Sequence, residues 1–259
     1  MAVAGLDVGA TYTKAVAVSN GDVLGEVKLF QGSESVPTIA DKALDEVAAA
    51  AGLSRDALEQ IAVTGVGRED CDPEWMKLVD GMCLAQAADK FYPDTRVVLD
   101  VGAQKVLAVR CIKGKALKFS KNEQCAGGTG RFLEMAAGIL RLDLPEMDEA
   151  AVNSDQPVEL QSVCSVFAES EILSQIHVQQ ATVPDIATGV LKALANRLFP
   201  LIARVGMQPE VLMVGGVSQS RALRGYLDEL LGFPTRLPQE FEFVGALGAA
   251  IIAAKGLSK

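Results

Sequence analysis

Histidine is almost absent from this chain of 259 residues, since His177 is the only one. A single histidine cannot build a poly-histidine metal site, and a Ser-His-Asp triad would rest on that one side chain. The sequence also lacks the G-x-x-x-x-G-K-[ST] and G-x-G-x-x-G loops. The Walker A and Rossmann modes of phosphate binding are therefore excluded.

Positive charge and long apolar runs are scarce as well. The chain has 24 Lys and Arg against 33 Asp and Glu, a net charge of -9, and no basic run. This balance disfavours binding to nucleic-acid phosphates or to an anionic membrane. The uncharged stretch 244–254 has 11 residues, well short of the roughly 20 that a spanning helix needs, and no basic segment precedes an apolar one at the N-terminus. We expect a cytoplasmic protein.

Five cysteines are present, an odd number. Disulfides are rare in the cytoplasm, so a cysteine that matters here is expected to be a ligand or a nucleophile.

The pattern of apolar and turn residues predicts alternating strands and helices. Short β-branched runs predict strands at 3–8, 13–19, 23–30, 61–65, 115–120 and 211–214. Helical spacing predicts helices from Pro37 to Gly52, at about 73–91, 127–142, 167–179 and 184–205, and from near 244.

The opening of the chain is repeated. GLDVGATYTKAVAV at 5–18 resembles VLDVGAQKVLAV at 98–109, with Asp-Val-Gly-Ala returning 93 positions later, since 100 minus 7 is 93. The sequence therefore predicts an α/β protein with mixed sheets in two related domains, 1–94 and 95–243. The helix near 244–259 is expected to pack back on the first domain.

Each copy places an aspartate at the end of an apolar strand and a glycine two residues later: Asp7 with Gly9, and Asp100 with Gly102. A carboxylate can hold hydrated Mg²⁺, and a glycine turn lets backbone N–H groups approach phosphate oxygens. An ordinary β-turn is the alternative for one copy, but duplication favours two hairpins that clamp one nucleotide. Thr11, Thr13 and Lys14 flank the first copy, and Gln104 flanks the second.

Two further glycine-rich segments are candidate nucleotide contacts. Gly215, Gly216 and Val217 follow a strand, where the backbone can approach an adenosine. Gly128, Thr129 and Gly130 open a helix and can wrap phosphates there, although a plain helix-entry loop is a serious alternative.

Several segments together resemble one known family, the ATP-dependent activators of 2-hydroxyacyl-CoA dehydratases, which is shared with the ATPase subunits of benzoyl-CoA reductases. The resemblance covers essentially the whole chain. It is carried by the two hairpins and by NEQCAGGTGRFLE at 122–134, SVCSVFAESEILSQ at 162–175, MVGGVSQ at 213–219 and GALGAAIIA at 245–253.

This resemblance implies an acetate kinase/Hsp70/actin-like (ribonuclease H-like) fold and an iron-sulfur ATPase. Such a protein takes electrons from a low-potential donor such as ferredoxin or flavodoxin and passes them to a CoA-ester dehydratase or reductase. It further implies that Asp7 and Asp100 organise Mg²⁺, that Gln104 places the attacking water, and that Gln219 joins the glycines above in binding ATP or ADP.

The resemblance also implies that Cys125 and Cys164 hold iron. Each precedes a predicted helix, whose dipole stabilises a thiolate. A [4Fe-4S] cluster takes four cysteines, so the simplest completion is a dimer, with an identical or homologous sister subunit, that shares one cluster. Cys111, in an apolar strand, is interpreted as a core residue.

The sequence departs from the family at the second hairpin, which reads Gly-Ala-Gln-Lys at 102–105 where the family usually has Gly-Gly-Gln-Asp. Lys105 therefore replaces an acid beside the expected γ-phosphate. This departure supports one alternative, a non-hydrolysing subunit of a heterodimeric ATPase. A second alternative is a small-molecule kinase of the same fold, for which the cysteine segments would be incidental.

Overall fold

The computed structural model describes residues 1–122, 129–152, 154, 156–160, 165–178 and 181–257. Contacts between residues divide the chain into two compact units. The first unit contains residues 1–98, 109–118 and 239–259, and the second contains 99–108 and 119–238. Residues 109–118 and the C-terminal segment thus belong to the first unit.

A five-stranded sheet forms the centre of the first unit, with strand order β3-β2-β1-β4-β5. Its strands are β1 (Ala2–Val8), β2 (Tyr12–Ser19), β3 (Asp22–Phe30), β4 (Leu58–Thr64) and β5 (Met76–Lys77). The hairpins pair antiparallel, whereas β1 and β4 run parallel. The second sheet has the order β8-β7-β6-β9, from β6 (Val97–Val101), β7 (Val106–Ile112), β8 (Lys115–Lys121) and β9 (Val211–Val214).

The two sheets repeat one topology. In each, the strand that ends at the repeated aspartate is followed by two hairpin-connected strands on one side, and it has a later strand, β4 or β9, on its other side. The internal duplication that the sequence predicts is therefore present in the order of the strands.

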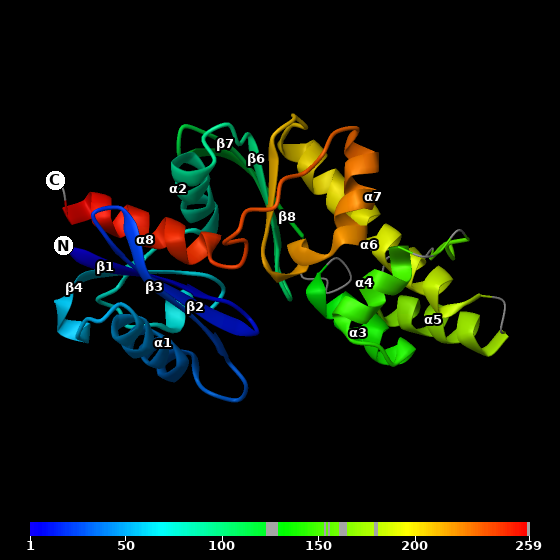
Figure 1. Cartoon of the computed structure of the whole chain (residues 1–259), viewed down its shortest axis with the longest axis horizontal. Coiled ribbons are helices and arrows are strands. Elements are labelled where there is room, and N and C mark those ends of the chain that lie inside the picture. The colour runs from blue at the N-terminus through cyan, green and yellow to red at the C-terminus, as the bar shows by residue number, and fades with distance from the viewer. Residues whose placement is uncertain (123–128, 153, 155, 161–164, 179–180, 258–259) are drawn as a thin grey trace. The chain divides into compact units, whose positions relative to one another are not determined.

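Helices cover both faces of the first sheet (Figure 1). Helix α1 (Val36–Ala50) is capped by Ser35, whose side chain accepts a hydrogen bond from the Thr38 amide, and ends before Gly52. Its buried face packs on Leu6, Val8 and their neighbours. Helix α8 (Val244–Leu257) covers the other face, where its backbone approaches β1 closely at Gly5. Helix α2 (Asp80–Phe91) packs against α8.

The second unit is mainly helical outside its sheet. It contains α3 (Gly130–Leu140), α4 (Leu144–Val152), α5 (Ser165–Val178), α6 (Val183–Val205) and α7 (Arg221–Leu231). Helix α6 is long and apolar enough to cross a membrane by length and composition, but 61% of its most apolar window is buried. It packs against α4 and α7, which is the role of a core helix.

One predicted helix is wrong in its first part. The stretch 73–91 is helical only from Asp80, and Met76–Lys77 instead forms β5, which pairs parallel with Ala62 and Val63. Extended backbone here covers the open edge of β4, and the Leu78 amide also donates to the Val63 carbonyl at 2.8 Å. Trp75 belongs to the buried core beneath α1.

Among the described residues, short 3₁₀ turns lie at Arg55–Ala57, Arg68–Asp70 and Gly216–Gln219.

Candidate nucleotide site and its relatives

The first hairpin presents the carboxylate of Asp7 on the α8 face of the sheet. Asp7 stands opposite Lys14, and its Oδ2 lies 3.9 Å from Lys14 Nζ. Gly9 forms the turn, where its amide donates to the Tyr12 carbonyl at 3.1 Å. Both charged side chains are mostly buried, with exposed fractions of 22% for Asp7 and 16% for Lys14. The two charged groups therefore lie together beside the turn, largely shielded from solvent.

Thr13 lies on the opposite face. It pairs with Val8, which belongs to the core beneath α1, and residues directly opposite in an antiparallel pair project to the same side. Thr13 is fully buried. Within the described residues, its hydroxyl and that of Thr11 are buried without a hydrogen-bond partner. An unpaired hydroxyl costs free energy, so Thr11, in the turn itself, stands to gain from a ligand oxygen.

The second hairpin repeats this geometry. The Gly102 amide donates to the Lys105 carbonyl at 2.8 Å, and Gly102 and Lys105 lie 93 positions after Gly9 and Tyr12. Lys105 Nζ lies 3.9 Å from Asp100 Oδ2. The side chain of Gln104 is exposed, so it is free to meet a ligand. Each aspartate thus has a lysine at the same distance, supplied from different positions of its hairpin.

A glycine with positive φ packs closely against one side of each carboxylate. Gly65 follows β4 with a φ of 97°, and a Cβ there would lie 2.7 Å from Asp7 Oδ1. Gly215 follows β9 with a φ of 86°, and its Cβ would lie 2.6 Å from Asp100 Oδ1. Of these two glycines, the sequence pattern indicated Gly215 but not Gly65. The signal available was the equivalent place of the two glycines, each directly after an apolar strand.

The glycine-rich helix entry is docked on the second hairpin. The amides of Gly130 and Arg131 donate to the carbonyls of Gly102 and Ala103, both at 2.9 Å. A Cβ on Gly130 would lie 3.0 Å from Val217 Cγ2. Three predicted nucleotide-binding residues, Gly102, Gly130 and Val217, therefore meet within the second unit. Thr129 is buried as the N-cap of α3, and Gly128 lies outside the described residues.

The turn after β9 is braced by its own side chains. Ser218 donates through its hydroxyl to the Gly215 carbonyl at 2.6 Å, and Gln219 donates from Nε2 to the Gly216 carbonyl at 2.9 Å. Gly216 is only partly buried. The backbone of this turn is thus fixed and accessible, which suits an approach to a nucleoside.

The sequence matches the BadF/BadG/BcrA/BcrD ATPase family over residues 4–253. The chain belongs to this family.

Its relatives include activating proteins of CoA-ester dehydratases. The 2-hydroxyisocaproyl-CoA dehydratase activator of Clostridioides difficile is 32% identical over 251 residues, which cover 96% of this chain and 93% of that protein. The (R)-2-hydroxyglutaryl-CoA dehydratase activating ATPase of Acidaminococcus fermentans is 32% identical over 256 residues, 98% of each. The solved structure of the activator from Clostridium difficile with bound ADPNP has a TM-score of 0.91, covering 100% of this chain and 96% of that one.

The actin-like ATPase fold predicted from the sequence is confirmed. A ROK hexokinase from Thermus thermophilus, 16% identical with a TM-score of 0.55 over 99% of this chain and 100% of that one, shares the fold alone. Likeness to kinases therefore carries no argument about activity, whereas membership of the BadF/BadG/BcrA/BcrD family identifies an ATPase lineage.

The cysteines of this family member divide into two groups. Cys125 and Cys164, predicted to hold iron, lie outside the described residues. Cys71, Cys83 and Cys111 are buried free thiols. Burial raises the pKa of Cys71 and of Cys111 to about 11, so both are protonated at neutral pH and are poor ligands. The core interpretation of Cys111 is confirmed.

Other candidate ligands are absent from the described part of the chain. His177 is exposed, and its Nδ1 lies 2.8 Å from the Leu173 carbonyl. No group of three or more His, Cys, Asp or Glu side chains within the described ranges is arranged to hold a metal ion.

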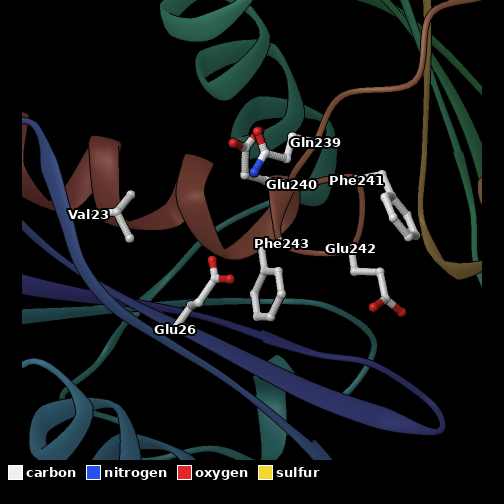
Figure 2. A pocket seen from close by; sticks show the side chains of 7 residues that line it. All are labelled: Val23, Glu26, Gln239, Glu240, Phe241, Glu242 and Phe243. Atoms are coloured by element: carbon white, nitrogen blue, oxygen red, sulfur yellow. The ribbon is translucent and has the colours of Figure 1, made fainter.

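A pocket of about 270 Å³ lies within the first unit, between β3 and the segment before α8 (Figure 2). Glu26 and Glu240 both line it. Burial raises the pKa of Glu26, and the negative charge of Glu240 raises it further. These carboxylates repel phosphate, and none of the predicted nucleotide-binding residues lines the pocket.

Proposed function

We propose that this chain is an iron-sulfur ATPase that couples ATP binding and hydrolysis to low-potential electron transfer onto a partner CoA-ester dehydratase or reductase. One observation carries the proposal furthest. In each unit an aspartate at a strand end is packed against a positive-φ glycine, in a member of an ATPase family whose relatives are named as dehydratase activators.

The residues present suit a magnesium nucleotide. Carboxylate oxygens are the hard ligands that Mg²⁺ prefers, and glycines beside them let the backbone approach phosphates. Asp7 and Asp100 would hold the metal ion. Phosphates would meet Gly9, Thr11 and Lys14 of the first hairpin and Gly102 of the second. The fit rests on the carboxylate-glycine cradles, which a Cβ would fill.

Catalysis by this chain would consist of positioning and charge stabilisation. Bound Mg²⁺ supplies neutralisation of phosphate charge. The exposed side-chain amide of Gln104 can orient a water molecule. The turn that carries Gln104 is fixed by Asn122, whose Nδ2 donates to the Gln104 carbonyl at 3.4 Å. Asn122 Oδ1 also accepts from the Val106 amide at 2.8 Å. No covalent phosphoenzyme is required.

The electron-transfer part of the proposal rests on Cys125 and Cys164. Two cysteines per chain are half of the four that a [4Fe-4S] cluster takes, which is why we propose a dimer with an identical or homologous sister subunit. A low-potential donor such as ferredoxin or flavodoxin would supply the electron. Nucleotide binding would bias a bistable subunit interface and so control delivery to the acceptor.

A second candidate is a non-hydrolysing subunit of a heterodimeric ATPase. Lys105 favours it, because a lysine lies beside Asp100 at a position where the family usually has an acid.

Purification without oxygen tests both candidates. The proposal expects a brown dimer with about four iron and four acid-labile sulfide atoms and Mg²⁺-dependent ATP hydrolysis. Iron without hydrolysis would favour the second candidate, and a colourless protein without iron would contradict electron transfer.

A further inference from the structure

Asp80 belongs to a small polar group that holds the loop after β4. Its Oδ1 accepts two hydrogen bonds, from the Gly65 amide at 2.7 Å and from the Thr64 hydroxyl at 2.8 Å. Its side chain is only 16% exposed. Asp80 is the first residue of α2, so a helix end and a strand end are joined by one carboxylate.

Arg68 holds the same glycine from its other side. Arg68 Nη1 donates to the Gly65 carbonyl at 3.3 Å, and it lies 4.0 Å from Asp80 Oδ2. The N–H and the C=O of Gly65 are thus both bound by side chains. The next turn is fixed as well, because the Gly67 amide donates to the Val8 carbonyl at 3.0 Å.

Gly65 in turn limits the space available to the side chain of Asp7. Its Cα faces Asp7 so closely that a Cβ would lie 2.7 Å from Oδ1, and the left-handed φ keeps the peptide in that orientation. Asp80 holds the peptide of Gly65 in place, and Gly65 limits where the carboxylate of Asp7 can lie. All three residues belong to the first unit.

The second unit offers a useful contrast. Ser218 stands three residues after Gly215, as Arg68 stands after Gly65, and it also binds the glycine carbonyl. In both units, therefore, a side chain three residues after the glycine binds the glycine carbonyl, and in the first unit this side chain is charged. Arg68 Nη1 lies 3.3 Å from its glycine carbonyl oxygen, and the Ser218 hydroxyl lies 2.6 Å from its own.

We infer that Asp80, acting through Gly65, is a positioning residue that orients Asp7 for the magnesium nucleotide. The inference rests on the proposed function, since it assumes that Asp7 meets Mg²⁺. Groups that orient a metal ligand typically account for 10–100-fold in metal affinity. The hydrogen bonds from Gly65 and Thr64 need an acceptor oxygen at Asp80, which the amide of an asparagine also provides.

The test is calorimetric binding of ADP to the full-length protein at a series of Mg²⁺ concentrations, with Asp80→Ala and Asp80→Asn variants. We expect Asp80→Ala to raise the Mg²⁺ concentration for half-maximal binding by roughly tenfold or more. Asp80→Asn should stay within about threefold of the parent, because it keeps the acceptor and loses the charge. An Asn variant as impaired as the Ala variant would overturn the hydrogen-bond mechanism.

Asp148 is the matched control. It also binds a hydroxyl and backbone amides, from Ser220, Arg221 and Ala222 at the start of α7, but it belongs to the second unit, whereas Asp7 and Gly65 belong to the first. Asp148→Ala should lower the urea midpoint without changing the Mg²⁺ requirement. Parental binding by Asp80→Ala would overturn the inference alone, whereas a parent that binds ADP without any dependence on Mg²⁺ would overturn the proposed metal site itself.

Discussion

Lys105 Nζ lies 3.9 Å from Oδ2 of Asp100, the carboxylate proposed to hold Mg²⁺. Partly exposed pairs of this kind contribute up to about 1 kcal/mol, and a metal ion must displace that interaction. We therefore expect Lys105→Ala to lower the Mg²⁺ concentration for half-maximal ATP hydrolysis by up to about fivefold. Lys118→Ala, which removes an exposed lysine of β8, controls for net charge. An unchanged requirement in Lys105→Ala would show that the lysine does not compete with the metal.

The paired glycines lead to a second prediction. An alanine at Gly65 or Gly215 must adopt positive φ and also approach an aspartate oxygen at less than 3 Å. Gly52 has a φ of 69° but nothing within 4 Å of its Cβ position, so Gly52→Ala measures the strain alone, about 1 kcal/mol. We expect Gly65→Ala and Gly215→Ala to lower the urea midpoint further and to weaken Mg-ADP binding, measured by calorimetry. Equal effects at all three positions would contradict a special role for the close contacts at Gly65 and Gly215, which involve the aspartate oxygens and the carbonyl oxygens of Val8 and Val101.

The fold was largely predictable because its signals are local. The Asp-x-Gly hairpins, the serine cap and terminal glycine of α1 and the apolar strands each lie within a few residues of one another. Helices α4 and α7 were missed although similar signals are present. Asp143 and Glu146 cap each other's amides before α4, and Ser220 caps α7 before Gly232 ends it. Segment 73–79 could not be assigned locally, because its extended form depends on the open edge of β4.

The site was predictable only in part, for a related reason. Aspartates and glycines close in sequence could be paired on inspection, and the internal repeat supported the pairing. The contact of Asp7 with Gly65 spans 58 positions, since 65 minus 7 is 58, and depends on the parallel register of β1 with β4. Asp80 was equally hidden, because nothing near it in sequence shows that it binds Gly65.

Neutralising either repeated aspartate should impair ATP hydrolysis and leave the iron-sulfur cluster intact. Asp7→Asn and Asp100→Asn keep the side-chain shape but remove a hard anionic ligand. We expect Mg-ATP hydrolysis to fall by more than the roughly tenfold that loss of a group behind a metal ligand costs. Iron content should stay at the parental value, because the carboxylates are not proposed to hold the cluster. Unchanged hydrolysis in both variants would remove the metal-binding assignment.

Buried thiols give a prediction about pH. The pKa values of Cys71 and Cys111 are about 11 in the folded protein, against an ordinary value of 9.0. Between pH 9 and 11 the unfolded thiols lose protons that the folded ones keep, so their contribution to the free energy of unfolding falls as pH rises. The urea midpoint of the parent should fall more steeply over this range than that of a Cys71→Ala, Cys111→Ala double variant. Equal slopes of the urea midpoint against pH in the parent and the variant would show that folding does not raise the pKa values of these thiols.

The last prediction concerns the cluster, and it uses all five cysteines. In a homodimer with one bridging [4Fe-4S] cluster, each substitution appears in both subunits, so Cys125→Ser or Cys164→Ser removes two of the four thiolates at once. We expect nearly complete loss of iron and sulfide from either variant after anaerobic purification. Cys71→Ser, Cys83→Ser and Cys111→Ser should keep the parental iron content, because those thiols are buried in the first unit.

Light scattering on the same samples shows whether a dimer is present, and the iron content distinguishes the two forms of the dimer. With a homologous sister subunit, each substitution would remove a single ligand, and a labile cluster with intermediate iron content would remain. With two identical subunits the loss is complete, because a pair of thiolates is half of the required set. Full iron content in both Cys125→Ser and Cys164→Ser would refute the bridging cluster, and would leave the ATPase assignment to stand on the family match and the aspartate-glycine pairs.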